Sequence, residues 1–256
     1  MFQSGKNTRA SDPSTAARFD LCRRQAASTS AFSGREALSG AVSKPPMQTL
    51  DSLSQTPDGA LSSPAARRNA EPILAVLRAH LPASGPVLEI ASGSGEHAVT
   101  FAASLGVDWT PSDPSTEARA SIEAWRATVD LPNLQPPLTL DVLNPATWPQ
   151  GPFKAVFCAN MIHISPWPAT EGLMELAGRT LLHPGGLLAL YGPFREADIP
   201  LAPSNAAFDD SLKARDPAWG LRDRAEVAAV AKRHGLAETM RFEMPANNLM
   251  LLFRRV

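Results

Sequence analysis

The sequence has few cysteines, one tyrosine and no long apolar run. Its 2 cysteines, Cys22 and Cys158, form neither a disulfide framework nor a set of metal ligands, which favours a reducing compartment and an expected cytoplasmic location. The 5 histidines have no ligand spacing, so we expect no metal. No stretch approaches the roughly 20 uncharged apolar residues that cross a bilayer, and we therefore expect no membrane partner.

An excess of charge of one sign is also lacking. The chain has 24 Lys and Arg against 25 Asp and Glu, a formal net charge of −1. This balance argues against a domain built to bind the phosphates of nucleic acids, so we expect no nucleic-acid partner. Proline is abundant instead, and most of the 24 prolines lie between periodic segments, where they end helices and strands.

Composition changes along the chain. Residues 1–60 are rich in Ser, Thr and Ala and have no sustained apolar period, so we expect a disordered tail or an upstream extension of the reading frame. Met47 is a second plausible start, and residues 1–46 have the composition of an organellar transit peptide, which leaves targeting as the alternative. The remaining residues, 61–256, are enough for one domain.

Strand and helix patterns alternate in this domain. We expect strands at residues 86–91, 107–110, 138–142, 155–159, 186–192, 237–243 and 248–254, and helices at 64–81, 96–105, 116–129, 170–182 and 222–234. Such alternation predicts an α/β fold with a doubly wound, seven-stranded and mostly parallel sheet. The last two strands are so close in sequence that they should form a hairpin, which makes the final strand antiparallel.

A glycine turn separates the first of these strands from its helix. Gly93 and Gly95 supply the turn, and the amino terminus of the helix offers unpaired N–H groups to a polar ligand. Asp113 and Asp141 each follow a later strand, where a carboxylate can bind ribose hydroxyls. These features converge at the carboxyl ends of the strands and predict a nucleotide-type site. A match of Gly93–Ala98 to the pattern of NAD enzymes is weak on its own.

The residues around the turn resemble a known motif. Glu89–Gly95 is similar to motif I of class I S-adenosylmethionine-dependent methyltransferases, with Ala91 in place of the first glycine. The terminal hairpin also resembles that Rossmann-like fold. The sole tyrosine, Tyr191, is followed four positions later by Arg195 rather than Lys, which removes the dyad of short-chain reductases.

A closer resemblance covers nearly the whole predicted domain. Five blocks occur in the order of domain-of-unknown-function family 938, which is grouped with methyltransferase-like 26: Ser63–Ile73, Glu89–His97, Asn160–Ile164 with Trp167, Tyr191–Phe194, and Met244–Leu249. The resemblance implies a methyltransferase fold. It leaves the acceptor and the role of the turn at residues 244–248 open.

The two resemblances, together with the position of His97 directly after the glycine turn, imply a set of cofactor contacts. For S-adenosylmethionine, with S-adenosylhomocysteine as product, they are Arg68, Asn69, Glu89, Ala91, Gly93, Gly95, His97, Asp113, Asp141, Val142 and Asn160. Simpler interpretations stay open for several of them. Glu89 could only bond turn amides, Asp141 could cap a turn, and His97 could cap a helix.

Methyl transfer from a sulfonium is an in-line displacement, in which orienting donor and acceptor can contribute about 7 to 11 kcal/mol. His163 is the candidate base, because it lies three residues beyond Asn160 at the end of an apolar strand and has an ordinary pKa of about 6.5. Asn160 and Tyr191 are the other catalytic candidates. A structural histidine is the alternative. An acceptor pocket is expected from Trp167, Phe194, Asn205, Phe208 and Trp219, with residues 193–219 as a lid, although aromatic side chains also fill cores.

The sequence thus predicts a methyltransferase that acts on an O, N or S atom of a small molecule. The alternative is a cofactor-binding scaffold that works through a protein partner. A nucleic-acid methyltransferase is disfavoured because no Asp/Asn-Pro-Pro-Tyr block follows the fourth strand. Whether the chain forms a homo-oligomer is left open.

Overall fold

The computed structural model describes residues 53–181 and 184–256. The expectations for residues 1–52 lie outside this part of the chain. Residues 53–60, which we assigned to the tail, are described: β1 (Ser54–Gln55) pairs antiparallel with β2 (Leu61–Ser62). The domain boundary at residue 61 stays a prediction.

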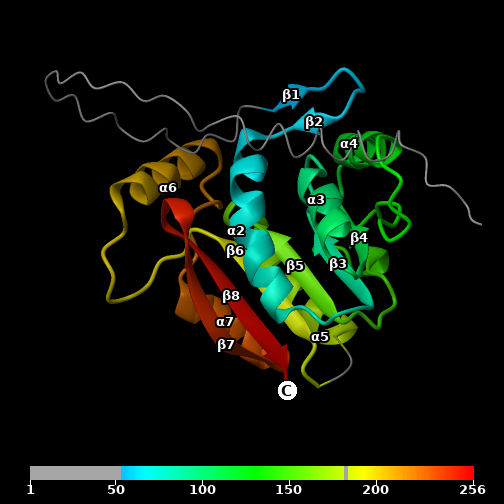
Figure 1. Cartoon of the computed structure of the whole chain (residues 1–256). Coiled ribbons are helices and arrows are strands. Elements are labelled where there is room, and N and C mark those ends of the chain that lie inside the picture. Colours follow the sequence, from blue (N-terminus) through cyan, green and yellow to red (C-terminus); the bar gives the residue numbers. More distant parts are fainter. Residues whose placement is uncertain (1–52, 182–183) are drawn as a thin grey trace, which may run out of the picture. The chain divides into compact units, whose positions relative to one another are not determined.

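The main sheet has the order β4-β3-β5-β6-β8-β7 (Figure 1). Its strands are β3 (Pro86–Ile90), β4 (Asp108–Pro111), β5 (Ala155–Ala159), β6 (Leu187–Gly192), β7 (Leu236–Met244) and β8 (Asn248–Arg255). The pairs β3–β4, β3–β5 and β5–β6 are parallel, whereas β8 is antiparallel to both β6 and β7. The α/β fold class, the mostly parallel sheet and the antiparallel last strand are confirmed.

The number of strands is a correction. The seventh strand, expected at residues 138–142, is present only as isolated bridges in which Leu134 and Leu138 meet Trp109 and Ser112 beside β4. Pro136 and Pro137 stand between the two bridges. Because proline has no N–H to donate, a continuous ladder cannot form there.

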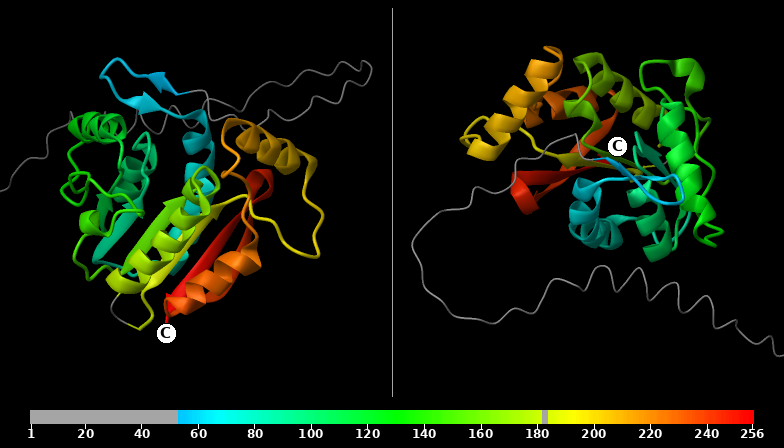
Figure 2. Two further views of the ribbon diagram at one scale, coloured as in Figure 1. Left: turned by 180° about the vertical axis from the view of Figure 1, so that it is seen from behind. Right: turned by 90° about the horizontal axis from the view of Figure 1, so that it is seen from above.

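Helices cover both faces of the sheet (Figure 2). They are α2 (Pro64–His80), α3 (Glu96–Ser104), α4 (Thr116–Ala127), α5 (Trp167–Thr180), α6 (Pro203–Arg215) and α7 (Arg224–Arg233), with short 3-10 turns η1 (Pro145–Thr147), η2 (Met161–His163) and η3 (Pro245–Asn247). Ser63 caps α2 by accepting a hydrogen bond from the Ala66 N–H, and Pro64 begins the helix, where the sequence predicted its start. None of the helices in the described ranges has the length and hydropathy needed to span a bilayer.

The strands carry apolar side chains on both faces because helices bury both. Val87, Phe157 and Ala189 pack on one side with α2 and α3. Leu88 and Val156 pack on the other side with α5 and α7. This arrangement brings the carboxyl ends of β3, β4, β5 and β6 to one edge, where loops carry most of the expected site residues.

Residues 193–219 hold a helix that the sequence pattern did not reveal. Phe208 and Leu212 of α6 pack on Leu221, outside the two main cores. The Asp209 carboxylate holds this helix in place, because it accepts hydrogen bonds from the Leu221 N–H at 2.7 Å and from Lys213 Nζ at 2.7 Å. The apolar face of α6 is too short and too interrupted to give a helical period by itself.

Candidate active site

The turn after β3 consists of left-handed residues at alternate positions. Ala91, Gly93 and Gly95 have φ of 54°, 55° and 89°. Gly95 must be small, since a Cβ there would lie 3.0 Å from the Ile122 Cα of α4. Gly93 is exposed and a Cβ there would meet nothing within 4 Å, so the space where a side chain would point is open. Ala91, where the family motif has glycine, holds a conformation that costs an ordinary residue about 1 to 2 kcal/mol.

Asp113 lies directly against this turn. The Gly93 N–H donates to its Oδ2 at 3.0 Å and the Ser115 N–H donates to its Oδ1 at 2.9 Å. The side chain is buried. The carboxylate therefore fixes the glycine turn to the amino terminus of α4, and each oxygen keeps a lone pair for a further donor.

Glu89 is buried below the turn. The Trp109 indole N–H donates to its Oε2 at 2.9 Å, and the Ser112 hydroxyl donates to its main-chain oxygen at 2.6 Å. Burial raises the pKa of Glu89 to about 7, although the Trp109 hydrogen bond opposes that shift. Near neutral pH this carboxyl can thus be protonated or charged.

Glu96, which sequence reasoning missed, is the most connected side chain of the turn. Its buried carboxylate accepts hydrogen bonds from the Ser63 N–H, the Ser62 and Ser94 hydroxyls and Arg67 Nη1. It therefore connects the start of α2 to the glycine turn. The available signal was an acid in the first turn of a helix that follows glycine.

His97 makes a second connection to α2. Its Nε2–H donates to the Ala66 carbonyl at 3.0 Å, and its ring stacks on Phe101 with 5.1 Å between centroids. Burial lowers the pKa of His97 to about 4, so the ring is neutral at pH 7. These contacts join the start of α3 to α2 and are not a helix cap, and a contact of His97 with a cofactor stays a prediction. Arg68 and Asn69 follow on the same helix, Arg68 exposed and Asn69 half-buried.

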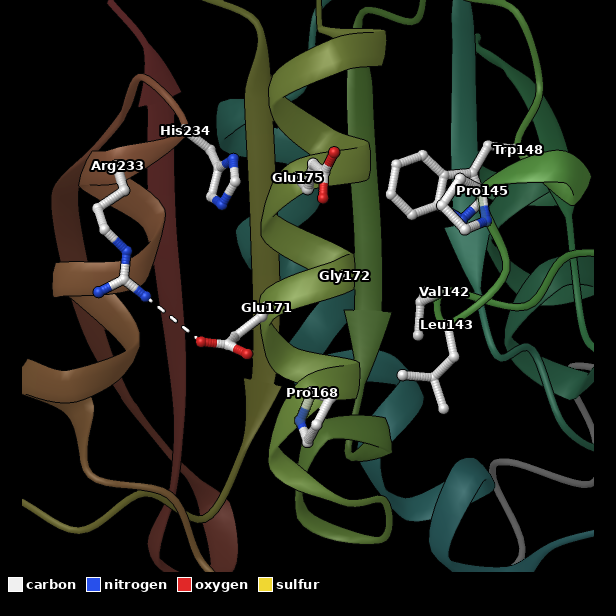
Figure 3. A pocket seen from close by; sticks show the side chains of 10 residues that line it. All are labelled: Val142, Leu143, Pro145, Trp148, Pro168, Glu171, Gly172, Glu175, Arg233 and His234. Carbon is white, nitrogen blue, oxygen red and sulfur yellow. Dashed lines mark hydrogen bonds and ion pairs between the residues drawn. The ribbon is translucent and has the colours of Figure 1, made fainter.

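Asp141 lies in a tight turn. Its Oδ1 accepts from the Leu143 N–H at 2.9 Å, and its carbonyl accepts from the Trp148 indole at 3.0 Å. This is the turn geometry that we gave as the alternative for Asp141. Val142 beside it lines a groove of about 460 Å³ along α5, which Glu171 and Arg233 also border (Figure 3). None of the residues lining that groove belongs to the glycine turn.

Asn160 and His163 follow β5. Asn160 has a left-handed φ of 61°, and its N–H donates to the Tyr191 carbonyl at 2.8 Å. His163 is fully buried, its Nδ1 accepts from the Arg222 N–H at 3.3 Å, and its ring meets Phe194 edge-on at 4.9 Å. Burial, with help from the Arg222 charge, lowers the pKa of His163 to about 3.

The protonation of His163 follows from these contacts. Since Nδ1 accepts a hydrogen bond in a neutral ring, the proton is on Nε2. That Nε2 has no hydrogen-bond partner among the described residues, and a Cβ at Gly192 would come within 2.6 Å of it. His163 thus presents a donor beside Asn160 rather than a free lone pair.

Tyr191 ends β6 and is buried. Burial raises the pKa of its hydroxyl, so the phenol is protonated at neutral pH. Asn248, at the start of β8, lies beside that hydroxyl and opposes the shift of its pKa. The Tyr191 hydroxyl can donate to Asn248 Oδ1 beside it, although neither atom makes a hydrogen bond of close geometry within the described ranges.

The residues expected to form one aromatic pocket fall into separate groups. Phe194 packs with the core near His163, and the Trp167 ring lies 5.7 Å from the Arg222 guanidinium. Phe208 and Trp219 belong to the small cluster around α6. Asn205 donates from Nδ2 to the Asn247 carbonyl at 2.9 Å, which joins α6 to the β7–β8 turn.

The sheet order, the helices on both faces and the left-handed glycine turn define a class I methyltransferase-like protein. The chain belongs to the family described as "Protein of unknown function (DUF938)", which it matches over residues 60–255. The resemblance found in the sequence is therefore confirmed.

Solved structures agree with this fold. An O-methyltransferase family protein from Burkholderia thailandensis is similar with a TM-score of 0.64 and 17% identity, over 75% of this chain and 57% of that one. Magnesium protoporphyrin IX methyltransferase from Synechocystis PCC 6803, with S-adenosylhomocysteine bound, is similar with a TM-score of 0.58 and 16% identity, over 74% of this chain and 83% of that one. A chain of the complex between the Haloferax volcanii Trm112 methyltransferase activator and a methyltransferase is similar with a TM-score of 0.58 and 16% identity. The match covers 74% of this chain and 91% of that one. The chain spans little more than half the length of the first of these structures.

Proposed function

We propose that the protein is an S-adenosylmethionine-dependent methyltransferase that methylates an O, N or S atom of a small molecule. The observation that carries the proposal is the exposed, left-handed Gly93 peptide at the carboxyl end of β3, with open space where a side chain would be and Asp113 hydrogen-bonded to its N–H. A turn of this kind lets a ligand approach the main chain closely.

The residues present suit this cofactor. In our proposal Asp113 binds the ribose hydroxyls through its remaining lone pairs, and the turn from Ala91 to Gly95 contacts the methionine portion. Glu96 holds the turn through the Ser94 hydroxyl, and Glu89 is buried beside it with the Trp109 indole donating to its carboxyl. When bound, the cofactor supplies a methyl group on a positively charged sulfur.

On the acceptor side, we assign binding and orientation to the chain's own groups. Asn160 ends the strand next to β3 and is fixed by its bond to the Tyr191 carbonyl. His163 acts as a hydrogen-bond donor through Nε2, because the Arg222 N–H occupies its other nitrogen. Proton loss from the acceptor then goes to solvent, and catalysis rests on holding the reactants in line.

The second candidate is a cofactor-binding scaffold that works through a protein partner. It is favoured by the absence of a free basic lone pair on His163, the expected base. A structure similar to this chain comes from a complex with a methyltransferase activator, which is compatible with a partner. Turnover separates the two candidates.

The test compares two glycines. Gly93 and Gly59 are both exposed, both have positive φ, and a Cβ at either would meet nothing within 4 Å. Alanine should cost each variant a similar free energy of unfolding, about 1 kcal/mol. Isothermal titration calorimetry should show that Gly93→Ala weakens S-adenosylhomocysteine binding at least tenfold, whereas Gly59→Ala binds as the wild type does.

Turnover is measured by S-adenosylhomocysteine formation from S-adenosylmethionine with a fractionated small-molecule extract. The methyltransferase proposal is supported if S-adenosylhomocysteine forms only when the extract is present and does not form in Gly93→Ala. Binding without turnover, together with a co-purifying protein, supports the scaffold. If the wild type binds neither cofactor form, both candidates are wrong.

A further inference from the structure

Arg222, which lies two residues before α7 begins, reaches the loop that carries His163. Its Nε–H donates to the Ile162 carbonyl at 2.8 Å, and its Nη2 donates to the carbonyls of Ser165 and Ala218. The first two carbonyls lie on either side of His163 in the segment after β5, whereas Ala218 belongs to the loop after α6. One guanidinium therefore joins two loops that are far apart in the sequence.

The main chain of the same segment holds both the ring and the backbone of His163. The Arg222 N–H donates to His163 Nδ1 at 3.3 Å, and the Gly220 N–H donates to the His163 carbonyl at 3.0 Å. The Arg222 carbonyl accepts from the Arg195 N–H at 2.9 Å, which ties this segment to the loop after β6. His163 is thus fixed by residues 220–222, which do not belong to its own loop.

Arg222 differs in its partners from Arg224, which is also half-buried and lies two residues along the chain. The Arg224 guanidinium donates to the carboxylates of Glu196 and Glu238. Arg222 forms no ion pair with a described residue, and its side chain bonds main-chain carbonyls only. The Trp167 ring of α5 lies 5.7 Å from its guanidinium. A planar fork that bonds several carbonyls fixes the position of the main chain that carries them.

The position of His163 sets the geometry at the carboxyl end of β6. A Cβ at Gly192, the last residue of that strand, would lie 2.6 Å from His163 Nε2 and 3.3 Å from Asn160 Oδ1. Both atoms therefore lie against the same glycine. Because this place is closely packed, a shift of the His163 ring also changes the surroundings of Asn160, and these are the two side chains that we assign to the acceptor.

We infer that Arg222 is a positioning residue for the acceptor site, an inference that rests on the proposed function. Its guanidinium fixes the loop around His163, and its N–H keeps Nδ1 as the accepting nitrogen, so that Nε2 carries the proton. Lysine cannot replace it, because one ammonium group lacks the planar fork that reaches several carbonyls at once. In this role Arg222 acts through His163 and not by contact with the cofactor or the acceptor.

The first measurement is NMR of the histidine ring nitrogens in the full chain, labelled with nitrogen-15 in histidine and saturated with S-adenosylhomocysteine. The signals of His163 are assigned by their loss in His163→Ala. In the wild type at neutral pH, Nδ1 should have the shift of an unprotonated nitrogen and Nε2 that of a protonated one. In Arg222→Gln and Arg222→Lys, both nitrogens should move toward the averaged shifts of mixed tautomers. Arg224→Gln and Arg224→Lys should keep the wild-type pattern.

The second measurement is the rate of S-adenosylhomocysteine formation from S-adenosylmethionine with the small-molecule extract, per folded molecule. Both Arg222 variants should lower this rate about 10- to 100-fold, because a small misplacement of an orienting group has an effect of that size. Their affinity for S-adenosylhomocysteine should stay within about twofold of the wild type. The Arg224 variants should keep both quantities. If Arg222 only stabilised the fold, its variants would lose unfolding free energy but keep the rate per folded molecule and the His163 signals.

The outcomes separate this inference from the proposed function. If the wild type neither binds S-adenosylhomocysteine nor forms it, the proposed function fails. If the wild type turns over, but the Arg222 variants keep its rate or its His163 signals, the positioning role is wrong. Full activity of Arg222→Lys, or an equal loss in the Arg224 variants, would also overturn it. A protonated Nδ1 in the wild type would do so without any variant, even if the Arg222 variants fail to fold.

Discussion

The Gly93 N–H donates to Asp113 Oδ2 at 3.0 Å, although the two residues belong to loops after different strands. The parallel pair β3–β4 makes this contact possible by ending both strands at one edge. The Gly93 peptide is therefore oriented by the same carboxylate that we propose for the ribose.

Asp113→Ala should impair both the turn and cofactor binding. It removes the acceptor for the Gly93 and Ser115 N–H groups, and we expect a loss of about 2 to 3 kcal/mol in the free energy of unfolding. Calorimetry should show S-adenosylhomocysteine affinity reduced at least 100-fold. Asp108→Ala, an exposed acid on β4, is the control and should change neither quantity. Wild-type affinity in Asp113→Ala would contradict the assignment.

Glu96→Gln should lower the free energy of unfolding more than Glu123→Gln, the matching change in a surface ion pair. One charged carboxylate accepts from Ser62, Ser63, Ser94 and Arg67, so we expect the free energy of unfolding to fall by about 2 to 4 kcal/mol in urea titrations.

The matching ion pair on the surface is Glu123 with Arg126, and Glu123→Gln should cost under about 1 kcal/mol. Arg67→Gln should also be mild, because that side chain is 56% exposed. A Glu96 variant as stable as the Glu123 variant would refute the role of Glu96 as the link between α2 and the turn.

Glu89 should make stability depend on pH. Its pKa is raised from 4.5 to about 7 in the folded protein, so the native state binds the additional proton between these values. The contribution is present below pH 4.5 and is lost as the pH rises to 7, a change of about 3 kcal/mol. Relative to Glu89→Gln, whose neutral side chain does not titrate, the wild type should lose that amount of unfolding free energy as the pH rises over this range. A constant difference would show that Glu89 stays charged.

His97 acts with the opposite sign. Its pKa is lowered from 6.5 to about 4, so its contribution is complete above pH 6.5 and is lost as the pH falls toward 4. We expect His97→Gln to lose less stability than the wild type between pH 6.5 and 4 in urea titrations. His80→Gln, at the end of α2, should follow the wild type, and a parallel course for all three would contradict this prediction.

His163→Ala should leave cofactor affinity within about twofold of the wild type and slow methyl transfer. Loss of the buried ring against Phe194 should cost about 2 to 4 kcal/mol of stability. Because burial lowers its pKa to about 3, kcat of the wild type should show no inflection near pH 6.5 that depends on this residue. Such an inflection, lost in His163→Ala, would restore the role of general base.

The pattern of the sequence determined most of the fold and the place of the site. Alternating apolar segments with proline and glycine stops predicted each strand of the main sheet and the helices packed on it, because burial on both faces leaves a clear period. The glycine turn and Asp113 were found because strand order alone brings them together. Helix α6 was not predicted because its apolar period is weak, and the strand expected beside β4 is interrupted because proline opposes a continuous ladder.

What only the tertiary structure decided is how each polar group is used. The proton position on His163 depends on the Arg222 N–H, which comes from a loop far along the chain. The connecting role of Glu96 depends on α2 lying beside the turn. The meeting of the Tyr191 hydroxyl with the Asn248 side chain depends on two antiparallel strands that bury both residues together. A sequence specifies which donors and acceptors exist, whereas their hydrogen-bond partners and pKa values follow from distances and burial in the folded chain.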